Sequence, residues 1–260
     1  MPLTDTHCHL QDLRYGDTLP KVLTKARGVG VTGFVCCGSS EDDWENVLGL
    51  ASQEKDIVPM LGLHPWYIDK ALLGWEKRLE NLLKTSYIGL GECGLDFAIP
   101  EASENKEEQI TILKTQWRMA LELNRPLSLH CRKAFEAMFE IAGALGMPNP
   151  GAVIHAFSGS AEQAKIAVQY GFYLSFSCSL MNLSNKRARK AILAVPLEKL
   201  MLETDSPDIS PTKGTLNEPA NLAHLFNVVA ELLGISREVL EKLLQDNVNK
   251  VFGMSENFLF

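Results

Sequence analysis

Histidine placement is the feature of this sequence that points most directly to chemistry. Five of the six histidines lie at or directly after the end of an expected β-strand, namely His7, His9, His64, His130 and His155. His7 and His9 form an H-x-H pair, and residues two apart on a strand point to the same side of it. Two satisfied core histidines are the alternative, but a pair of imidazoles is a costly filling for an apolar core. The pair therefore predicts a shared metal ion.

Two acidic residues end expected strands in the same way. Glu92 follows the apolar run Tyr87–Leu90, and Asp205 closes the eighth expected strand. A buried carboxylate needs a partner or a cation. For Glu92 taken alone an arginine is as good a partner as a metal, although its two oxygens also allow it to bridge two ions. Glu203 shares a face with Asp205 by the period of two but lies deeper, so Asp205 is predicted to be the site residue.

The predicted metal ligands come from strands one, four, five, six and eight, and they are His7, His9, Glu92, His130, His155 and Asp205. Nitrogen and oxygen ligands suit Zn²⁺, Mn²⁺ or related ions rather than thiolate chemistry. Such an ion lowers the pKa of its bound water to about 7, and two ions can clamp both oxygens of a phosphodiester displacement. The sequence thus predicts a hydrolase that uses divalent metal ions. The cysteines beside these ligands are expected to point away and to pack between strand and helix: Cys8, Cys93 and Cys131.

Residues near these ligands are candidates for holding a substrate. His64, Arg132 and Lys133 are predicted to contact a phosphate group, although a surface pair at a helix start is the alternative for Arg132 and Lys133. Trp66 and Tyr67 follow His64, and they could stack on a base or, equally, anchor a loop. The basic run at residues 186–190 is better interpreted as a solvated helix face.

Strand-like and helix-like segments alternate along the whole chain. Strands are expected near Leu3–Cys8, Gly33–Cys37, Ile57–Leu63, Tyr87–Glu92, Pro126–Cys131, Ala152–His155, Phe172–Ser177 and Lys199–Asp205. Helices are expected at Thr18–Arg27, Glu41–Gln53, Glu76–Leu83, Glu107–Leu123, Ala134–Leu145, Ala161–Tyr170, Asn185–Ala194, Pro219–Leu233 and Arg237–Val251. Eight such units predict an α/β fold, a (β/α)₈ TIM-type barrel, as one domain over residues 1–260. The loose loops Phe97–Asn105 and Ser206–Pro219 follow strands, so they belong at the face where barrel active sites lie.

Composition narrows the class of partner. The formal net charge is -7, so the protein does not attract nucleic acid through bulk charge, and an anionic substrate needs a local positive site such as bound metal. No apolar run approaches the length of a membrane span, and the start of the sequence does not resemble a secretion leader. The six cysteines show no C-x-x-C spacing, which favours free thiols in the cytoplasm. The sequence leaves the oligomeric state open, and a monomer is compatible with it.

Taken together, the motifs resemble those of the TatD family of metal-dependent deoxyribonucleases, within the amidohydrolase-like barrels. The matching segments are Asp5-Thr-His-Cys-His9, Gly62-Leu-His-Pro65, Gly91-Glu-Cys-Gly-Leu-Asp96, His130-Cys-Arg132, His155-Ala-Phe-Ser-Gly159, Glu203-Thr-Asp-Ser-Pro207 and Asn217-Glu-Pro219. They run in order over nearly the whole chain, and as a set they are highly specific.

The resemblance implies a TIM-type barrel with two metal ions. One ion would be bound by His7, His9, Glu92 and Asp205, and the other by Glu92, His130 and His155. It also implies Mg²⁺- or Mn²⁺-supported removal of nucleotides from DNA ends, with Asp205 orienting the attacking water and Glu92 as the second catalytic residue. His64 would match a residue that binds substrate phosphate.

Two departures from the family pattern concern the substrate. Lys133 stands where the family often has an acidic residue, and Leu216 stands where a basic residue often precedes Asn-Glu-Pro. The leading interpretation is a 3′–5′ exonuclease that acts on single-stranded DNA or frayed ends. The main alternative is a metal-dependent ester or amide hydrolase, such as an aminoacyl-tRNA deacylase or a small-molecule amidohydrolase. A non-catalytic binding protein is a third class, which competent residues at all six ligand positions argue against.

Overall fold

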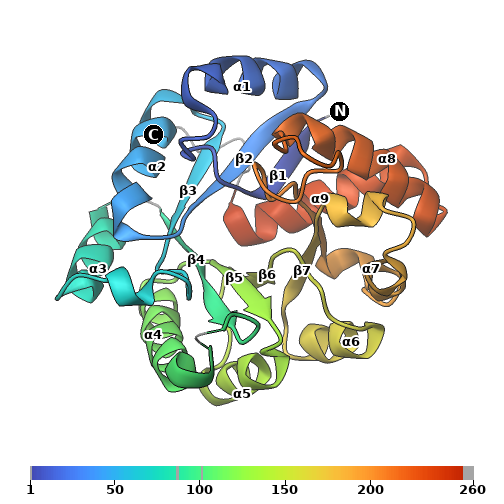
Figure 1. The fold of residues 1–260 in the computed structure, drawn as a ribbon. Coiled ribbons are helices and arrows are strands. Elements are labelled where there is room, and N and C mark those ends of the chain that lie inside the picture. Colours follow the sequence, from blue (N-terminus) through green and yellow to red (C-terminus); the bar gives the residue numbers. More distant parts are fainter. Residues whose placement is uncertain (1, 86–87, 101, 254–260) are drawn as a thin grey trace.

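Eight short parallel strands form one sheet in chain order (Figure 1). The structure is a computed structural model that describes residues 2–85, 88–100 and 102–253. The strands are β1 (Leu3–Cys8), β2 (Val31–Gly38), β3 (Ile57–Leu61), β4 (Gly89–Asp96), β5 (Leu127–Arg132), β6 (Ala152–Ile154), β7 (Tyr173–Phe176) and β8 (Leu200–Leu202). Nearly every strand residue is buried, as expected for parallel strands that are covered on both sides.

Helices follow the strands and surround the sheet (Figure 1). The α-helices are α1 (Leu19–Gly28), α2 (Glu41–Gln53), α3 (Trp75–Thr85), α4 (Ala102–Glu122), α5 (Phe135–Leu145), α6 (Ala161–Gln169), α7 (Lys186–Ile192), α8 (Leu222–Leu233) and α9 (Arg237–Phe252). Short 3₁₀ turns lie at Gly16–Thr18, Ile68–Lys70, Cys178–Met181, Leu197–Lys199 and Pro219–Asn221. Over the described ranges, none of these helices combines the length and apolar character that a membrane span requires.

The sheet returns to its first strand just beyond the end of β8. Cys8 and Ser206 form a parallel bridge, and the Ser206 carbonyl accepts a 2.7 Å hydrogen bond from the His9 amide. The Asp205 amide donates to the His7 carbonyl at 3.0 Å. These contacts bring the eighth strand beside the first in a nearly closed barrel, so the predicted (β/α)₈ architecture is confirmed. They also place Asp205 beside the H-x-H pair.

One end of the barrel is covered by α9. Val248, Val251 and Phe252 pack against buried side chains of the strands, including Met60 and Met201. The side-chain Nδ2 atom of Asn247 donates to the carbonyl of Leu200, the first residue of β8, at 2.8 Å. The helix therefore covers the end where the strands begin, and the opposite end is left for a site.

The cysteines beside the predicted ligands lie in the strand–helix layer, as expected. Cys8, Cys93 and Cys131 are buried within the main apolar cluster. All six cysteines of the chain are free. Cys8, Cys93 and Cys131 act as packing residues, whereas Cys37 lies inside the barrel with its Sγ atom 3.4 Å from His7 Nδ1.

Several element ends differ from the sequence-based prediction. The fourth strand does not end at Glu92: β4 continues to Asp96, which pairs with Arg132 of β5. Conversely, β8 ends at Leu202, so Asp205 follows the strand instead of closing it. The helix expected from Glu107 begins at Ala102, which shortens the loop predicted over Phe97–Asn105. Tyr87, the expected start of the fourth strand, and the ends of the predicted domain at residues 1 and 254–260 lie outside the described residues.

Gly94 lies opposite His130 in the β4–β5 ladder, where no side chain fits. A Cβ atom there would lie 2.0 Å from the His130 carbonyl oxygen, and its φ of +150° disfavours other residues. We expect Gly94→Ala to lower the free energy of unfolding by about 3 kcal/mol or more, the upper end of the cost of overpacking. Urea denaturation measures this change.

Gly49→Ala is the matched control for Gly94→Ala. Gly49 lies within α2, and nothing lies within 4 Å of the position its Cβ would take. Because alanine favours a helix over glycine, this variant should be more stable by up to about 1 kcal/mol. Equal unfolding midpoints for the two variants would contradict the close approach of β4 to β5.

Candidate active site

The predicted metal ligands converge at the carboxyl ends of the strands, around a cavity of about 910 Å³. Its wall includes His9, Glu92, His130, His155 and Asp205. His7 lies beneath them and is fully buried. Residues separated by up to 198 positions in the sequence thus meet in one place because all of them lie on or just after barrel strands.

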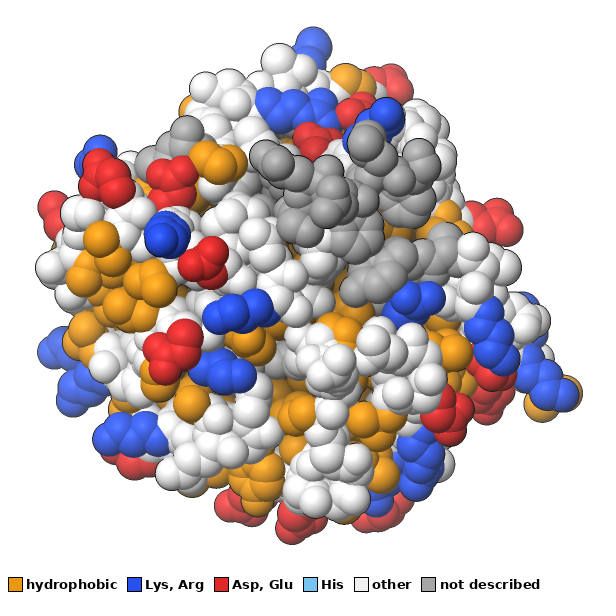
Figure 2. Space-filling view, turned by 180° about the vertical axis from the view of Figure 1, so that it is seen from behind, with side chains coloured by type: hydrophobic (Ala, Val, Ile, Leu, Met, Phe, Trp, Pro, Cys, Tyr) orange, Lys and Arg blue, Asp and Glu red, His pale blue; other side chains and the backbone are white. Residues whose placement is uncertain are grey.

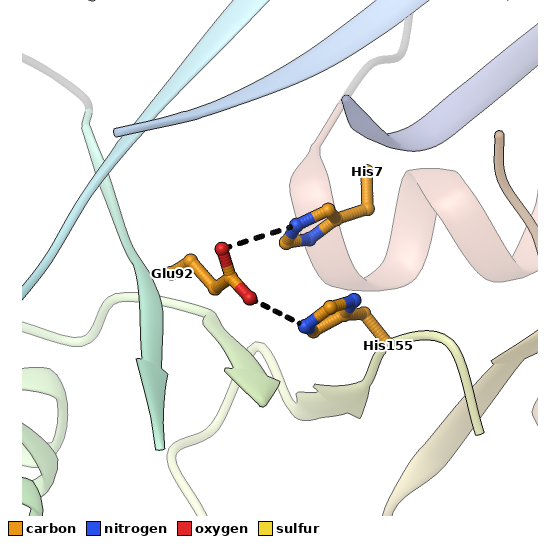
Figure 3. A group of neighbouring side chains, drawn as sticks. All are labelled: His7, Glu92 and His155. Carbon is orange, nitrogen blue, oxygen red and sulfur yellow. Dashed lines mark ion pairs between the residues drawn. The ribbon is translucent and has the colours of Figure 1, made fainter. Parts of the chain in front are cut away.

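Glu92 stands at the centre of this cluster, with its two carboxylate oxygens facing different histidines. Oε1 lies 3.1 Å from His130 Nδ1 and 2.8 Å from His155 Nε2. Oε2 lies 3.4 Å from His9 Nε2 and 3.8 Å from His7 Nε2. Figure 3 shows the carboxylate beside the stacked rings of His7 and His155, with one oxygen directed to each. This arrangement suits a carboxylate that is shared between two positive centres.

Asp205 completes the group that surrounds Oε2. Its Oδ1 atom lies 3.5 Å from His9 Nε2 and 3.9 Å from His7 Nε2. Glu203 is fully buried: its Oε1 atom accepts a 2.6 Å hydrogen bond from the Ala156 amide and lies 3.6 Å from His155 Nδ1. The structure thus places Asp205 among the candidate ligands and Glu203 behind one of them.

The charges of this cluster shift its pKa values. Burial raises the pKa of Glu92, but the surrounding histidines outweigh that effect and hold it well below its ordinary value. The pKa of Asp205 is also lowered, since contact with His9 and the charge of His155 overcome the effect of burial. Burial lowers the pKa of His9, yet Asp205 and Glu92 raise it to about 9. Both carboxylates therefore remain ionised at neutral pH and attract cations.

The ring nitrogens fit metal ligation. His9 Nδ1 donates to the Cys37 carbonyl at 2.8 Å, so Nε2 is the nitrogen that faces the carboxylates and would bind an ion in place of its proton. His7 Nδ1 bonds Ser128 Oγ at 2.8 Å, and its buried Nε2 has no hydrogen-bond partner among the described residues. His155 Nε2, although close to Glu92, also lacks an aligned hydrogen bond. Buried nitrogens without such partners are costly, and divalent ions would satisfy them.

His64 lies beside the same carboxylate, but its hydrogen bonds favour a different role. Its Nε2 atom is 3.2 Å from Glu92 Oε1, and with Glu92 and His130 it forms a group that could hold an ion. However, its Nδ1 atom accepts a 3.1 Å hydrogen bond from the Trp66 amide, which places the proton on Nε2. Burial lowers the pKa of His64 to about 4, although the charge of Glu92 acts in the opposite direction. His64 is therefore neutral at pH 7 and presents a donor, as binding of a phosphate oxygen requires.

Asp96 is a site residue to which the sequence analysis assigned no role. Its Oδ2 atom accepts hydrogen bonds from His130 Nε2 at 3.0 Å, from Trp66 Nε1 at 2.8 Å and from Arg132 NH1 at 3.1 Å. Burial raises the pKa of Asp96, but the hydrogen bonds from His130 and the Ala98 amide lower it to about 2. A carboxylate two residues after Gly94 was the available signal, and it was missed because the strand was expected to end earlier.

The predicted substrate contacts divide into two groups. Arg132 lines the cavity, whereas Lys133 is exposed and is not part of the cavity wall. From the basic run, Arg187 reaches the wall and bonds Gln163 at 3.2 Å. The wall also holds Asp12, Asp42, Asp43 and Asp208, of which Asp12 and Asp208 are paired with Arg14. Arg132 and Arg187 are thus two cationic side chains of the wall that an anionic chain would meet.

A family model described as TatD related DNase matches residues 4–253. The chain belongs to the TatD-related DNase family. The resemblance seen in the motifs is thus confirmed, and with it the expected class of metal-dependent hydrolase. The match spans every strand and helix that contributes to the cavity.

Individual relatives cover nearly the whole chain. A mouse protein named "Putative deoxyribonuclease TATDN3" is 32% identical and covers 99% of this chain and 90% of its own length. A Pantoea ananatis protein named "3'-5' ssDNA/RNA exonuclease TatD" is 28% identical, with 96% of this chain and 99% of its own length covered. The crystal structure of YJJV, a TatD homologue from Escherichia coli K12, matches with a TM-score of 0.92 at 27% identity, covering 97% of this chain and 98% of that one.

Ser128 orients a candidate ligand without reaching the cavity. Its hydroxyl is fully buried and bonds His7 Nδ1 at 2.8 Å. Outer partners of this kind typically contribute 10–100-fold to metal affinity or activity. We expect Ser128→Ala to weaken metal binding by about 10–100-fold, measured by competition with a chromogenic chelator. Unchanged affinity would show that the barrel alone orients His7.

Proposed function

We propose that this protein is a 3′–5′ exonuclease that removes nucleotides from single-stranded or frayed DNA ends and uses two divalent metal ions, Mg²⁺ or Mn²⁺. The observation that carries the proposal is the position of Glu92, which turns one oxygen toward His130 and His155 and the other toward His7 and His9. Bound divalent cations would supply Lewis acidity that acidifies water and offsets charge on the scissile phosphate. His7, His9, Glu92 and Asp205 would hold one ion, and Glu92, His130 and His155 the other.

The remaining side chains have roles that follow from their positions. Asp205 would accept the proton of the attacking water, because its depressed pKa keeps it ionised at neutral pH. His64 would donate its Nε2 proton to a phosphate oxygen, and Arg132 would bind a second phosphate beside it. Asp96 keeps His130 and Arg132 in place through hydrogen bonds of 3.0 and 3.1 Å.

The charge distribution of the protein supports an enzyme that binds the end of a DNA strand. The chain carries a net charge of -7. On the face drawn in Figure 2, acidic and basic side chains are interspersed instead of gathering by sign. This face therefore offers a long duplex no continuous basic patch. A short strand that enters the cavity, with phosphates near Arg132 and Arg187, fits the charge distribution better.

End-labelled oligonucleotides test the reaction. Metal-loaded protein should produce a product ladder from the 3′ end of single-stranded DNA, a blocked 3′ end should slow it, and closed circles should resist it. Rapid nicking of closed circles would refute the exonuclease. Failure to cut any DNA, together with hydrolysis of an ester or amide, would establish the alternative hydrolase.

Metal content tests the two-ion proposal separately. Elemental analysis after reconstitution should approach two divalent ions per chain. Chelation should abolish turnover while the circular dichroism spectrum persists, because a core of this size does not depend on a metal for folding. Wholesale unfolding on chelation would show that the ions are structural.

We also place the protein in the cytoplasm. The support is that all six cysteines are free and buried, which suits a reducing compartment.

A further inference from the structure

Trp66 is an exposed aromatic residue at the cavity wall. Three of the described Trp, Tyr and Phe residues line this cavity: Trp66, Tyr67 and Phe157. Phe157 is buried. The Tyr67 ring is half-buried and already has a cation over it, since Lys70 Nζ lies 5.0 Å from its centre. Trp66 is 48% exposed, so its ring has a surface that a ligand can cover.

The ring of Trp66 is fixed in spite of its exposure. Its Nε1 atom donates a 2.8 Å hydrogen bond to Asp96, a carboxylate with 0% exposure. Its edge-on contact with His64, with ring centres 5.1 Å apart and planes at 86°, holds it from a second side. A loop anchor would bury its apolar face, whereas here the polar edge is bound and much of the ring remains open.

The Trp66 ring is linked through Asp96 to the candidate metal centre. Asp96 Oδ2 also accepts from His130, a candidate metal ligand, and from Arg132, whose side chain is 49% exposed. An aromatic plane and a guanidinium group thus share one buried carboxylate next to the candidate metal centre. A nucleotide has the matching pair of groups, because every base has a stacking face and every phosphate binds a cation.

We infer that Trp66 is the base-stacking platform of the site, and that it holds a nucleobase of the strand end while His64 and Arg132 face the phosphates. The inference rests on the proposed nuclease function and adds a determinant of specificity to it. A base that stacks on Trp66 must leave the base stack of a duplex, so the platform favours single-stranded or frayed ends. Asp96 is the positioning residue, since it fixes the indole ring.

Abasic oligonucleotides distinguish stacking from a merely structural role. In the wild type, removing the base that stacks on Trp66, by an abasic site at that nucleotide, should lower kcat/KM by about 5- to 150-fold. This is the range expected for loss of one stacked base. Trp66→Ala should cause the same loss on the intact strand and no further loss on the abasic one. Trp66→Phe retains a stacking face but lacks the indole N–H, so it should keep most of the base dependence.

Leu13→Ala is the matched control for Trp66→Ala. Leu13 is 89% exposed and lines the same cavity, but it has no aromatic face. Its replacement should leave the ratio of intact to abasic turnover as in the wild type. If Trp66→Ala lowers turnover equally on intact and abasic strands at every position, Trp66 only supports His130 through Asp96, and the platform is refuted.

Fluorescence provides a measurement that does not need turnover. The other three tryptophans, Trp44, Trp75 and Trp117, are buried, with exposures of 3%, 7% and 0%. Binding of a slowly cut phosphorothioate oligothymidylate to the metal-loaded protein should quench the emission of Trp66, and Trp66→Phe should abolish the change. Quenching without cleavage of any DNA would refute the nuclease but retain the platform. Cleavage without quenching and without base dependence would retain the nuclease and refute the platform.

Discussion

Replacing Asp205 by asparagine is expected to lower kcat by at least about 10²-fold at saturating metal, the lower end for loss of general acid–base help. The carboxylate lies 3.5 Å from His9 Nε2, among the candidate ligands, and its lowered pKa keeps it available to accept a proton. Asparagine has nearly the same shape but neither the charge nor the basicity. Steady-state kinetics on a single-stranded oligonucleotide over a range of Mn²⁺ concentrations measure the loss.

Asparagine is also the substitution that the backbone tolerates at this position. Asp205 has a φ of +56°, a left-handed conformation that Asn and Asp adopt far more readily than other residues with side chains. An alanine variant would combine loss of the carboxylate with backbone strain. The asparagine variant should therefore unfold at the same urea concentration as the wild type, which assigns the loss of kcat to the side chain.

Glu203→Gln is the matched control for Asp205→Asn. Glutamine can still accept the Ala156 hydrogen bond that Glu203 receives at 2.6 Å, and it remains behind His155 instead of in the cavity. Weaker metal binding is expected, by the 10–100-fold typical of outer partners, with turnover recovered at high metal. Equal losses of kcat in both variants at saturating metal would show that Glu203 shares the role assigned to Asp205.

The barrel could be predicted from the sequence because its strands are buried on both sides. Each strand then appears as a short apolar run between helical segments, and eight such runs left little choice of architecture. The candidate ligand positions followed from the same logic, since a polar residue that ends an apolar run must face either solvent or a site. All six predicted ligands meet around one cavity for this reason.

The strand ends could not be predicted because a polar residue looks the same in sequence whether it is solvated or bonded. Asp96 lay beyond the expected strand end at Glu92, yet three side-chain donors on Oδ2 allow β4 to continue through it. His64 presented a similar problem. Its role depends on which nitrogen carries the proton, and that is decided by the amide of Trp66, a contact that only the folded loop creates.

Glu92→Gln is expected to have the largest effect on metal content. Glutamine keeps one oxygen and replaces the other by an NH₂ group, so it can face only one of the two histidine groups as an acceptor. The proposed two-ion site should then bind one ion or none. Because outer partners alone account for 10–100-fold, loss of this shared ligand should lower kcat/KM by more than about 10²-fold. Elemental analysis and kinetics on the same preparation link the two losses.

The control for Glu92→Gln separates the position of the carboxylate from its charge. Glu108→Gln removes the same unit of negative charge from an exposed position on α4, and it should leave metal content and turnover unchanged. Glu92, in contrast, lies within 4 Å of five histidine nitrogens. A Glu92→Gln protein that still binds two ions and turns over within tenfold of the wild type would mean that the carboxylate is a hydrogen-bond partner of these histidines. The ions would then have to be bound by the histidines and Asp205 alone.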